Sequence, residues 1–215
     1  MNPCDISLYG IIDPHRTRGR SLTDLTKAAA EGGITLLQYR DKDADTRTLI
    51  NNAAAIKQAL SGYDIPLLIN DRVDVALAVE ADGVHVGQSD MEPKDVRRLL
   101  GPDAIIGLTI KTIENAVAAP LDMIDYACIG GVFSTLSKQN PSNIGLDGWS
   151  EVAAHFRKVA PDLPVGAIAG INASNLESVL KNGADGAAII SAIFMADDVT
   201  AATRELKQIT NRCLS

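Results

Sequence analysis

Gln38, Arg40 and Lys42 stand at alternating positions at the end of an apolar run. Side chains alternate between the two faces of a strand, so these three side chains share one side of the chain. The arginine fork matches phosphate oxygens, and lysine adds a mobile point charge. The segment therefore predicts binding of a phosphorylated ligand. The alternative is a solvent-exposed basic strand end that pairs with Asp41 and Asp43.

Two carboxylates, Asp71 and Asp90, follow the next two apolar runs along the chain. Beside a cationic cluster, such oxygen ligands suit Mg²⁺, which proteins hold with one or two carboxylates together with substrate phosphates and water. Each aspartate taken alone also fits a turn or a helix cap. Their combination with Arg40 and Lys42 favours a magnesium site beside the phosphate-binding segment.

A second phosphate site is predicted near the end of the chain, where Gly170 and Ser191 follow the last two apolar runs. Backbone N–H groups at a helix start bind phosphate, and glycine permits a close backbone approach. Ordinary helix starts are the alternative. A metal-held diphosphate next to a phosphorylated second ligand suggests a reaction in which the second ligand displaces diphosphate.

These residues must be positioned by a fold in which apolar runs and amphipathic stretches alternate. Near-continuous apolar runs are typical of parallel strands that are covered on both faces. Eight such units in 215 residues predict one domain, residues 1–215, folded as a (β/α)₈ barrel whose strand-to-helix loops form the catalytic face. An open doubly wound sheet is the rival, but the chain lacks an early Gly-x-Gly-x-x-Gly. The expected strands are 8–12, 35–39, 66–69, 83–86, 105–108, 126–129, 165–168 and 187–190, and a helix is expected over 46–60.

Glycines mark the approach to several expected strands. Glu31-Gly32-Gly33 precedes the second, Ala81-Asp82-Gly83 the fourth, and Gly183-Ala184-Asp185-Gly186 the eighth. We interpret these glycines as left-handed turns that end helices. The recurring Ala-Asp-Gly is a weak internal repeat, as expected for a fold of equivalent βα units.

The connection 130–148, after the sixth expected strand, is long, polar and rich in hydroxyl groups. Long loops without regular structure in a compact domain are usually functional or disordered. Because this loop would lie on the catalytic face of a barrel, we predict a functional role rather than a plain flexible connection.

Composition excludes several classes of protein. The chain has 20 Lys and Arg against 27 Asp and Glu, and its net charge of −7 argues against general nucleic-acid binding. Cys4, Cys128 and Cys213 have neither disulfide-framework nor zinc-site spacing. No signal peptide is evident, and the most apolar run, 186–196, is too short to cross a bilayer. We expect a soluble, cytoplasmic protein with reduced thiols.

Six segments, in order along nearly the whole chain, resemble the thiamine phosphate synthase family. The resemblance implies a transferase that joins 4-amino-2-methyl-5-(diphosphooxymethyl)pyrimidine (aminopyrimidine diphosphate) to 4-methyl-5-(2-phosphoethyl)thiazole (thiazole phosphate). The products would be thiamine phosphate and diphosphate. The segments are Gln38-Tyr39-Arg40-Asp41-Lys42, Asn70-Asp71, His85-Val86-Gly87-Gln88-Ser89-Asp90, Thr135-Leu136-Ser137-Lys138, Ala169-Gly170-Ile171 and Ile190-Ser191-Ala192.

The resemblance also implies a role for each matching residue, with Asp71 and Asp90 as the Mg²⁺ ligands and Arg40, Lys42 and Lys138 as the catalytic cations. The residues implied to contact aminopyrimidine diphosphate are Gln38, Tyr39, Arg40, Asp41, Lys42, Asn70, Thr109 and Lys138. Those implied to contact thiazole phosphate are Thr135, Leu136, Ser137, Gly170, Ile190 and Ser191. The chain departs from the family at Thr109 (commonly Ser), Ser137 (Thr), Ala169 (Gly) and Gln139-Asn140 (a charged pair). These departures bear on the shape of the thiazole pocket rather than on the reaction.

The implied chemistry needs no general base, because the thiazole nitrogen attacks with its own lone pair. His15, His85 and His155 are scattered along the chain and are expected to be structural. We expect a dissociative displacement, in which the electron-rich pyrimidine stabilises a cationic methylene while cations and Mg²⁺ stabilise the departing diphosphate.

Two other functions are open to the same fold. A thiazole tautomerase of the same superfamily would bind only thiazole phosphate, and a non-catalytic barrel would bind or sense a ligand. The complete set of residues for a diphosphate and a metal argues against both. The expected partners are small molecules rather than nucleic acid or membrane, and a homo-oligomer stays open.

Overall fold

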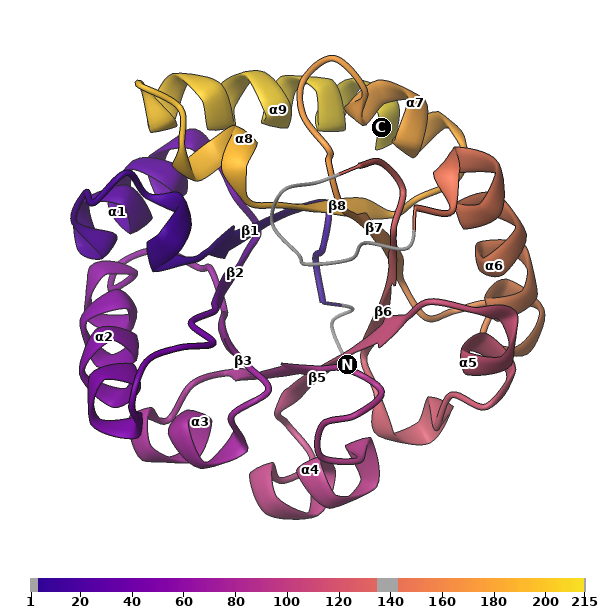
Figure 1. Cartoon of the computed structure of the whole chain (residues 1–215), viewed down its shortest axis with the longest axis horizontal. Coiled ribbons are helices and arrows are strands. Elements are labelled where there is room, and N and C mark those ends of the chain that lie inside the picture. Colours follow the sequence, from indigo (N-terminus) through magenta and orange to yellow (C-terminus); the bar gives the residue numbers. More distant parts are fainter. Residues whose placement is uncertain (1–3, 135–142, 215) are drawn as a thin grey trace.

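Eight parallel strands close into a barrel in chain order, with β8 hydrogen-bonded to β1 (Figure 1). The computed structural model describes residues 4–134 and 143–214. The closed barrel confirms the predicted fold class. The strands are β1 (Leu8–Ile12), β2 (Leu36–Tyr39), β3 (Leu67–Asn70), β4 (Gly83–Val86), β5 (Ile105–Ile110), β6 (Tyr126–Gly130), β7 (Val165–Ile168) and β8 (Gly186–Ile189).

Helices surround the barrel as an outer ring (Figure 1). The last helix packs against α1 and α7 and closes this ring. The α-helices are α1 (Leu22–Gly32), α2 (Thr46–Ala59), α3 (Val73–Val79), α4 (Pro93–Leu100), α5 (Ile113–Val117), α6 (Gly145–Val159), α7 (Leu176–Lys181), α8 (Ser191–Phe194) and α9 (Val199–Leu214). Two 3-10 turns, η1 (Pro14–Arg16) and η2 (Leu121–Met123), lie in the connections.

Helix α2 illustrates how local sequence sets the elements. The Asp45 carboxylate accepts a hydrogen bond from the backbone N–H of Thr48 at 3.0 Å and caps the first turn. Leu49, Ala53 and Ile56 then recur at helical spacing and are buried. The helix therefore begins where predicted, and its last helical residue is one before the predicted end.

Alternation along the strands divides the apolar side chains into two cores. Outward-facing side chains such as Leu37 pack between the barrel and the helices. Inward-facing side chains such as Leu36 fill the barrel itself. The second, smaller core consists of Ile6, Tyr9, Ile11, Leu36, Leu68, Tyr126, Cys128 and Ala188. Two of its members, Tyr9 and Tyr126, also carry hydroxyl groups that take part in the hydrogen bonds described below.

Three aspartates link neighbouring strands at the end of the barrel where the strands begin, which we call the N-terminal rim. Asp82, Asp125 and Asp185 each precede a strand, and each carboxylate accepts a backbone N–H at the start of the strand before it. The donors are Leu67, Ile106 and Val165, each at 2.7 Å. Arg97 and Arg157 pair with Asp125 and Asp185 at 2.8 and 2.9 Å. The Ala-Asp-Gly repeat therefore marks a repeated structural device, which also occurs at Asp125 without the flanking residues.

The glycines near these aspartates have two different roles. Gly33 and Gly183 adopt the predicted left-handed conformation, with φ of 101° and 97°. Gly83 and Gly186 instead begin strands, and the turn interpretation is wrong for them. A Cβ atom there would lie 1.9 Å from the carbonyl oxygens of Ile105 and Ile6. Only glycine permits this approach of neighbouring backbones.

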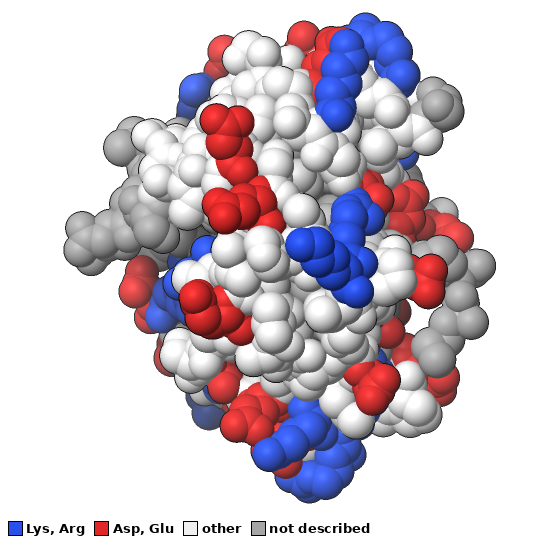
Figure 2. All heavy atoms as spheres, turned by 90° about the vertical axis from the view of Figure 1, so that its right-hand side faces the viewer, with Lys and Arg blue, Asp and Glu red and all other residues white. Residues whose placement is uncertain are grey.

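Charged side chains of both signs are interspersed on the face in Figure 2, without one continuous basic stripe. Within residues 4–134 and 143–214, no helix has the length and apolar character needed to span a bilayer.

Candidate active site

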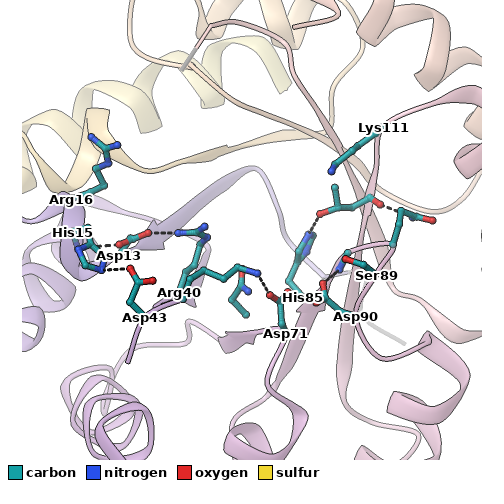
Figure 3. Close-up of a pocket in the computed structure, with 15 residues that line it drawn as sticks. Asp13, His15, Arg16, Arg40, Asp43, Asp71, His85, Ser89, Asp90 and Lys111 are labelled. Atoms are coloured by element: carbon teal, nitrogen blue, oxygen red, sulfur yellow. Dashed lines mark hydrogen bonds and ion pairs between the residues drawn. The ribbon is translucent and has the colours of Figure 1, made fainter. Parts of the chain in front are cut away.

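A cavity of about 900 Å³ lies at the carboxyl ends of β1 to β5, and we call it the rim cavity (Figure 3). Its lining includes equal numbers of fixed negative and positive side chains among the described residues. The carboxylates are Asp13, Asp43, Asp71 and Asp90. The cations are Arg16, Arg40, Lys42 and Lys111. The rim cavity is thus strongly polar without a large net charge of its own.

Arg40 and Lys42 both line the rim cavity, as the alternation of side chains predicts. Arg40 forms an ion pair with Asp13, and Lys42 forms one with Asp71 (Figure 3). The Asp13 side chain is only 6% exposed, whereas Lys42 is half exposed. The alternative expectation was a basic strand end paired with Asp41 and Asp43. The ion-pair partners of Arg40 and Lys42 are instead Asp13 and Asp71. Each cation is therefore held at the rim by a carboxylate from a neighbouring loop.

Asp71 and Asp90 come together on neighbouring loops, where a metal could bind. Burial raises the pKa of Asp71 above its ordinary value, and the Asp90 carboxylate adds to the rise, whereas Lys42 opposes it. The φ of 59° at Asp71 is left-handed. Asp90 also accepts the Gly87 backbone N–H at 2.8 Å. Two neighbouring carboxylates, one of them with a raised pKa, suit a divalent cation that would offset their negative charge.

The described part of the chain holds no group of three or more His, Cys, Asp or Glu that could form a metal cage. This arrangement suits Mg²⁺, because Mg²⁺ takes only one or two carboxylates and completes its shell with water and substrate phosphates. The residues present therefore fit a magnesium ion that a phosphorylated ligand helps to hold.

Below the rim, a smaller cavity of about 40 Å³ opens into the barrel, and we call it the floor cavity. Arg40, Asn70, His85 and Thr109 line both cavities, so the two adjoin. The remaining floor lining is Tyr9, Gln38 and the apolar side chains of Ile11, Cys128, Ile168 and Ile190. The floor is thus polar toward β2 to β5 and mostly apolar toward β6 to β8.

Five polar side chains cross the barrel in a continuous series, here called the barrel chain. The Gln38 amide nitrogen donates to the Tyr9 hydroxyl, which lies 3.0 Å from the hydroxyl of Tyr126. Tyr126 lies 2.8 Å from Nδ1 of His85, and Nε2 of His85 lies 2.8 Å from the Thr109 hydroxyl. Burial raises the pKa values of Tyr9 and Tyr126 well above the ordinary tyrosine value, so both hydroxyls keep their protons.

Tyr39 and Asp41 lie beside the site but do not line either cavity. The Tyr39 hydroxyl accepts from Asn52 on α2 and donates to Asp41, and burial raises the pKa of Tyr39 to about 12. Asp41 also accepts the backbone N–H groups of Asp43 and Ala44. These two side chains therefore shape the loop that presents Arg40.

On the opposite side, Gly170 has a φ of 67°, and a Cβ there would lie 2.6 Å from the carbonyl oxygen of Ser134. Its neighbour Ala169 has a φ of 101°, which is unfavourable for any residue with a side chain. Ile190 lines the floor cavity, and Ser191 begins α8. Thr135, Leu136, Ser137 and Lys138 lie outside the described residues, as do Gln139 and Asn140 and thus most of the polar part of the loop 130–148.

Sequence reasoning missed several residues of the rim. Asp13 follows β1 directly and Lys111 follows β5, so the rule that loops after strands face the site would have found both. His85, which we expected to be structural, lines both cavities and bonds Thr109. His15 also reaches the rim, 3.0 Å from Asp43, whereas His155 bonds a backbone carbonyl of its own helix.

Comparison with known proteins decides the family. Residues 8–193 match the family model described as thiamine monophosphate synthase. The thiamine-phosphate synthase of Agrobacterium fabrum is 48% identical over 215 residues, which cover all of this chain and 98% of the relative. The chain belongs to this family.

Other relatives of the thiamine monophosphate synthase family agree. The thiamine-phosphate synthase of Chloroflexus aurantiacus is 42% identical and covers 96% of this chain and 94% of its own. The solved thiamine phosphate pyrophosphorylase of Pyrococcus furiosus superposes with a TM-score of 0.86 at 37% identity, over 99% of this chain and 98% of that one. The predicted family, and with it an enzyme of the transferase class, is confirmed.

Proposed function

We propose that this member of the thiamine phosphate synthase family joins aminopyrimidine diphosphate to thiazole phosphate, giving thiamine phosphate and diphosphate, with Mg²⁺. The observation that carries the proposal is the meeting of Arg40, Lys42, Asp71 and Asp90 at one rim. Two cations and two carboxylates there suit a diphosphate and the ion that accompanies it. Neither a tautomerase nor a simple thiazole-phosphate binder would need this set.

In the proposed reaction, the bond between the methylene carbon and the diphosphate oxygen breaks, and diphosphate leaves with the electron pair. The thiazole nitrogen then forms the new C–N bond with its lone pair. No proton has to be removed from either reacting atom, so the site needs no general base. Arg40, Lys42 and Lys138 stabilise the charge that develops on the leaving group, and bound Mg²⁺ would contribute as a Lewis acid.

Charge balance supports this assignment. Free diphosphate carries roughly −3 near neutral pH, since its last ionisation resembles that of a phosphate. The described carboxylates and cations of the rim cancel one another. Lys138 and one divalent ion would then supply the three positive charges that balance the leaving group.

The thiazole phosphate would lie toward β7 and β8, near Gly170, Ile190 and Ser191, with Thr135, Leu136 and Ser137 completing its site. Support comes from the floor cavity, whose apolar half, including Ile168 and Ile190, faces that side. These apolar side chains suit the edge of a weakly polar ring, whereas the charged rim suits the diphosphate.

One assay tests the proposal and separates its rivals. Both substrates are mixed with the protein, with and without EDTA, and thiamine phosphate is measured. We expect product only without the chelator, and excess Mg²⁺ should restore it. Absence of product under every condition, with the thiazole tautomer interconverted instead, would identify a tautomerase, and ligand binding without turnover would identify a non-catalytic barrel.

A further inference from the structure

Arg20 lies in the segment that connects β1 to α1 and lines neither cavity. Its Nε donates to the backbone carbonyl of Thr17 at 3.1 Å, within the same segment. Its two terminal nitrogens donate to the carbonyls of Ala196 and Phe194 at 2.8 and 2.6 Å. These two carbonyls lie 176 and 174 positions further along the chain, at the end of α8. Arg20 therefore links the loop after β1 to the end of α8, which lie beside each other in Figure 1.

The end of α8 depends on this side chain. The last carbonyls of a helix have no partner within the helix and need one from elsewhere. Within residues 4–134 and 143–214, no backbone N–H donates to the carbonyl of Phe194 or Ala196. The planar guanidinium of Arg20 bonds both carbonyls at once, and the single ammonium of a lysine does not reproduce this fork.

The loop after β1, in contrast, has several hydrogen bonds of its own. The Asp13 carboxylate forms an ion pair with Arg40. The Thr17 hydroxyl donates to the carbonyl of Pro14 at 2.9 Å, and Thr17 is buried. Loss of the Arg20 side chain should therefore leave this loop in place and release mainly α8.

Helix α8 carries part of the site proposed for thiazole phosphate. Ser191 is its first residue, and Ile190, directly before it, lines the floor cavity. At its other end, the buried Phe194 ring packs against β1, where a Cβ atom at Gly10 would lie 3.4 Å from Cζ of Phe194. The helix has four residues, which is about one turn. A shift of its end would therefore also move its start.

We propose that Arg20 is a positioning residue for thiazole phosphate, because it holds α8 against the loop after β1 and so fixes Ile190 and Ser191 relative to the rim cavity. The inference rests on the proposed function and deepens it. The loop that contains Arg20 also supplies Asp13 to the rim cavity. This one side chain thus connects the two sides on which the substrates would lie, and small displacements of reacting groups are costly in rate.

A second arginine spans the same two segments and provides a matched control. Arg18 forms an ion pair with Asp197, but the two side chains are 53% and 94% exposed. Exposed ion pairs contribute little to stability. Asp197→Asn removes this pair and leaves the carbonyl bonds of Arg20 in place, so it should behave as wild type.

The first test follows α8 directly and needs no substrate. Hydrogen exchange of the ligand-free protein is measured for wild type, Arg20→Lys, Arg20→Met and Asp197→Asn. We expect faster exchange at the N–H groups of Phe194 and Met195, which are bonded within the turn, most of all in Arg20→Met. Exchange over β1 and in Asp197→Asn should match wild type. Unchanged exchange at α8 in the Arg20 variants would overturn the proposal.

The second test compares the two substrates. KM for thiazole phosphate and KM for aminopyrimidine diphosphate are each measured at saturating co-substrate. We expect Arg20→Met to raise KM for thiazole phosphate at least about 10-fold and to leave KM for aminopyrimidine diphosphate within about twofold. Arg20→Lys should show the same selective change to a smaller extent, and it serves as the test if Arg20→Met does not fold.

Arg97→Ala controls for a purely structural effect. Arg97 also donates to backbone carbonyls, but at the N-terminal rim. A loss of stability lowers the amount of active enzyme and leaves the ratio of the two KM values unchanged, so Arg97→Ala should keep the wild-type ratio. A selective rise in one KM value therefore reports positioning rather than folding.

The outcomes separate the two proposals. If wild type makes no thiamine phosphate, the proposed function fails and the positioning role fails with it. If wild type is active but folded Arg20 variants raise both KM values equally, or neither, Arg20 does not position the thiazole site and this inference fails alone.

Discussion

At the N-terminal rim, Arg97 and Arg157 meet aspartates that also accept strand N–H groups, whereas at the cavity Arg40 and Lys42 meet aspartates that line the rim cavity. The carboxylates at the first end have all of their partners within the fold. At the second end, the left-handed Asp71 lies near Asp90, and burial raises its pKa. The same residue types thus stabilise one end of the barrel and leave the other prepared for a ligand.

The largest expected effect compares two arginines whose side chains are both 18% exposed, Arg40 at the cavity and Arg97 at the N-terminal rim. Arg40→Ala should lower turnover about 10²–10³-fold, or about 2.7–4 kcal/mol, if its contact strengthens as charge develops on the diphosphate. Steady-state kinetics measure this. A fall of less than threefold in both kcat and kcat/KM would exclude the role.

Removing the proposed metal ligand Asp71 should lower activity and, in the metal-free protein, raise stability. We expect Asp71→Asn to lower Mg²⁺-dependent activity by more than the roughly 10–100-fold that loss of an outer metal partner costs. In the metal-free protein, the same change should raise the free energy of unfolding at neutral pH. The reason is that the raised native pKa of Asp71 makes its ionised form unfavourable in the fold.

The pH dependence of the free energy of unfolding gives a second measurement of this effect. As pH falls through the raised native pKa of Asp71 toward the ordinary aspartate value of about 3.9, wild type should gain stability relative to the variant. Urea unfolding across this range measures the difference. Asp185→Asn is the matched control: it should lower stability, because Asp185 holds both Arg157 and a strand N–H. An Asp71→Asn protein that is less stable at neutral pH would contradict the comparison.

Arg97→Ala should lower stability and leave turnover nearly unchanged, whereas Arg40→Ala should chiefly lower turnover. Arg97 donates to Asp125 and to four backbone carbonyls, and its loss should cost about 3 kcal/mol of stability. Turnover of the folded fraction should stay within about twofold, since the residue is remote from the cavity. Denaturant midpoints and kinetics at low temperature measure the two effects. A large loss of kcat in folded protein would remove the contrast between the two ends.

The smallest effect concerns Ala169, where the backbone has a φ of 101°. Ala169→Gly should raise the free energy of unfolding by about 1 kcal/mol, because strain worth about 1–2 kcal/mol exceeds the entropy cost of glycine. Ala167→Gly, two residues earlier within β7, should instead lower it by a similar amount. A lower denaturant midpoint for Ala169→Gly would show that the conformation is not strained.

The sequence predicts the barrel well because apolar runs and helix-ending glycines such as Gly33 are local signals of strands and turns. The predicted strands differ from the observed ones by at most two residues, as at β5, which extends to Ile110 and includes Thr109. The meeting of Arg40, Lys42, Asp71 and Asp90 follows from their places after neighbouring strands. Asp13, the partner of Arg40, follows β1 beside β2, so the same rule would have found it. The barrel chain was hidden because its members meet only inside the closed barrel: Tyr9 and Tyr126 are 117 positions apart and look like ordinary core residues.

The aspartates of the N-terminal rim also govern what the opposite end displays. Each one ties the start of a strand to the residue just before the next strand, 15 to 20 positions later, so neighbouring strands cannot slide past each other. A slip of one residue would turn every inward side chain of a strand toward the helices. His85 on β4, which Asp82 ties to β3, would then leave the barrel interior, and the catalytic face would lose its pattern although every residue was still present. The chemistry at the mouth thus depends on three carboxylates at the opposite end of the barrel, none of which lines the cavity.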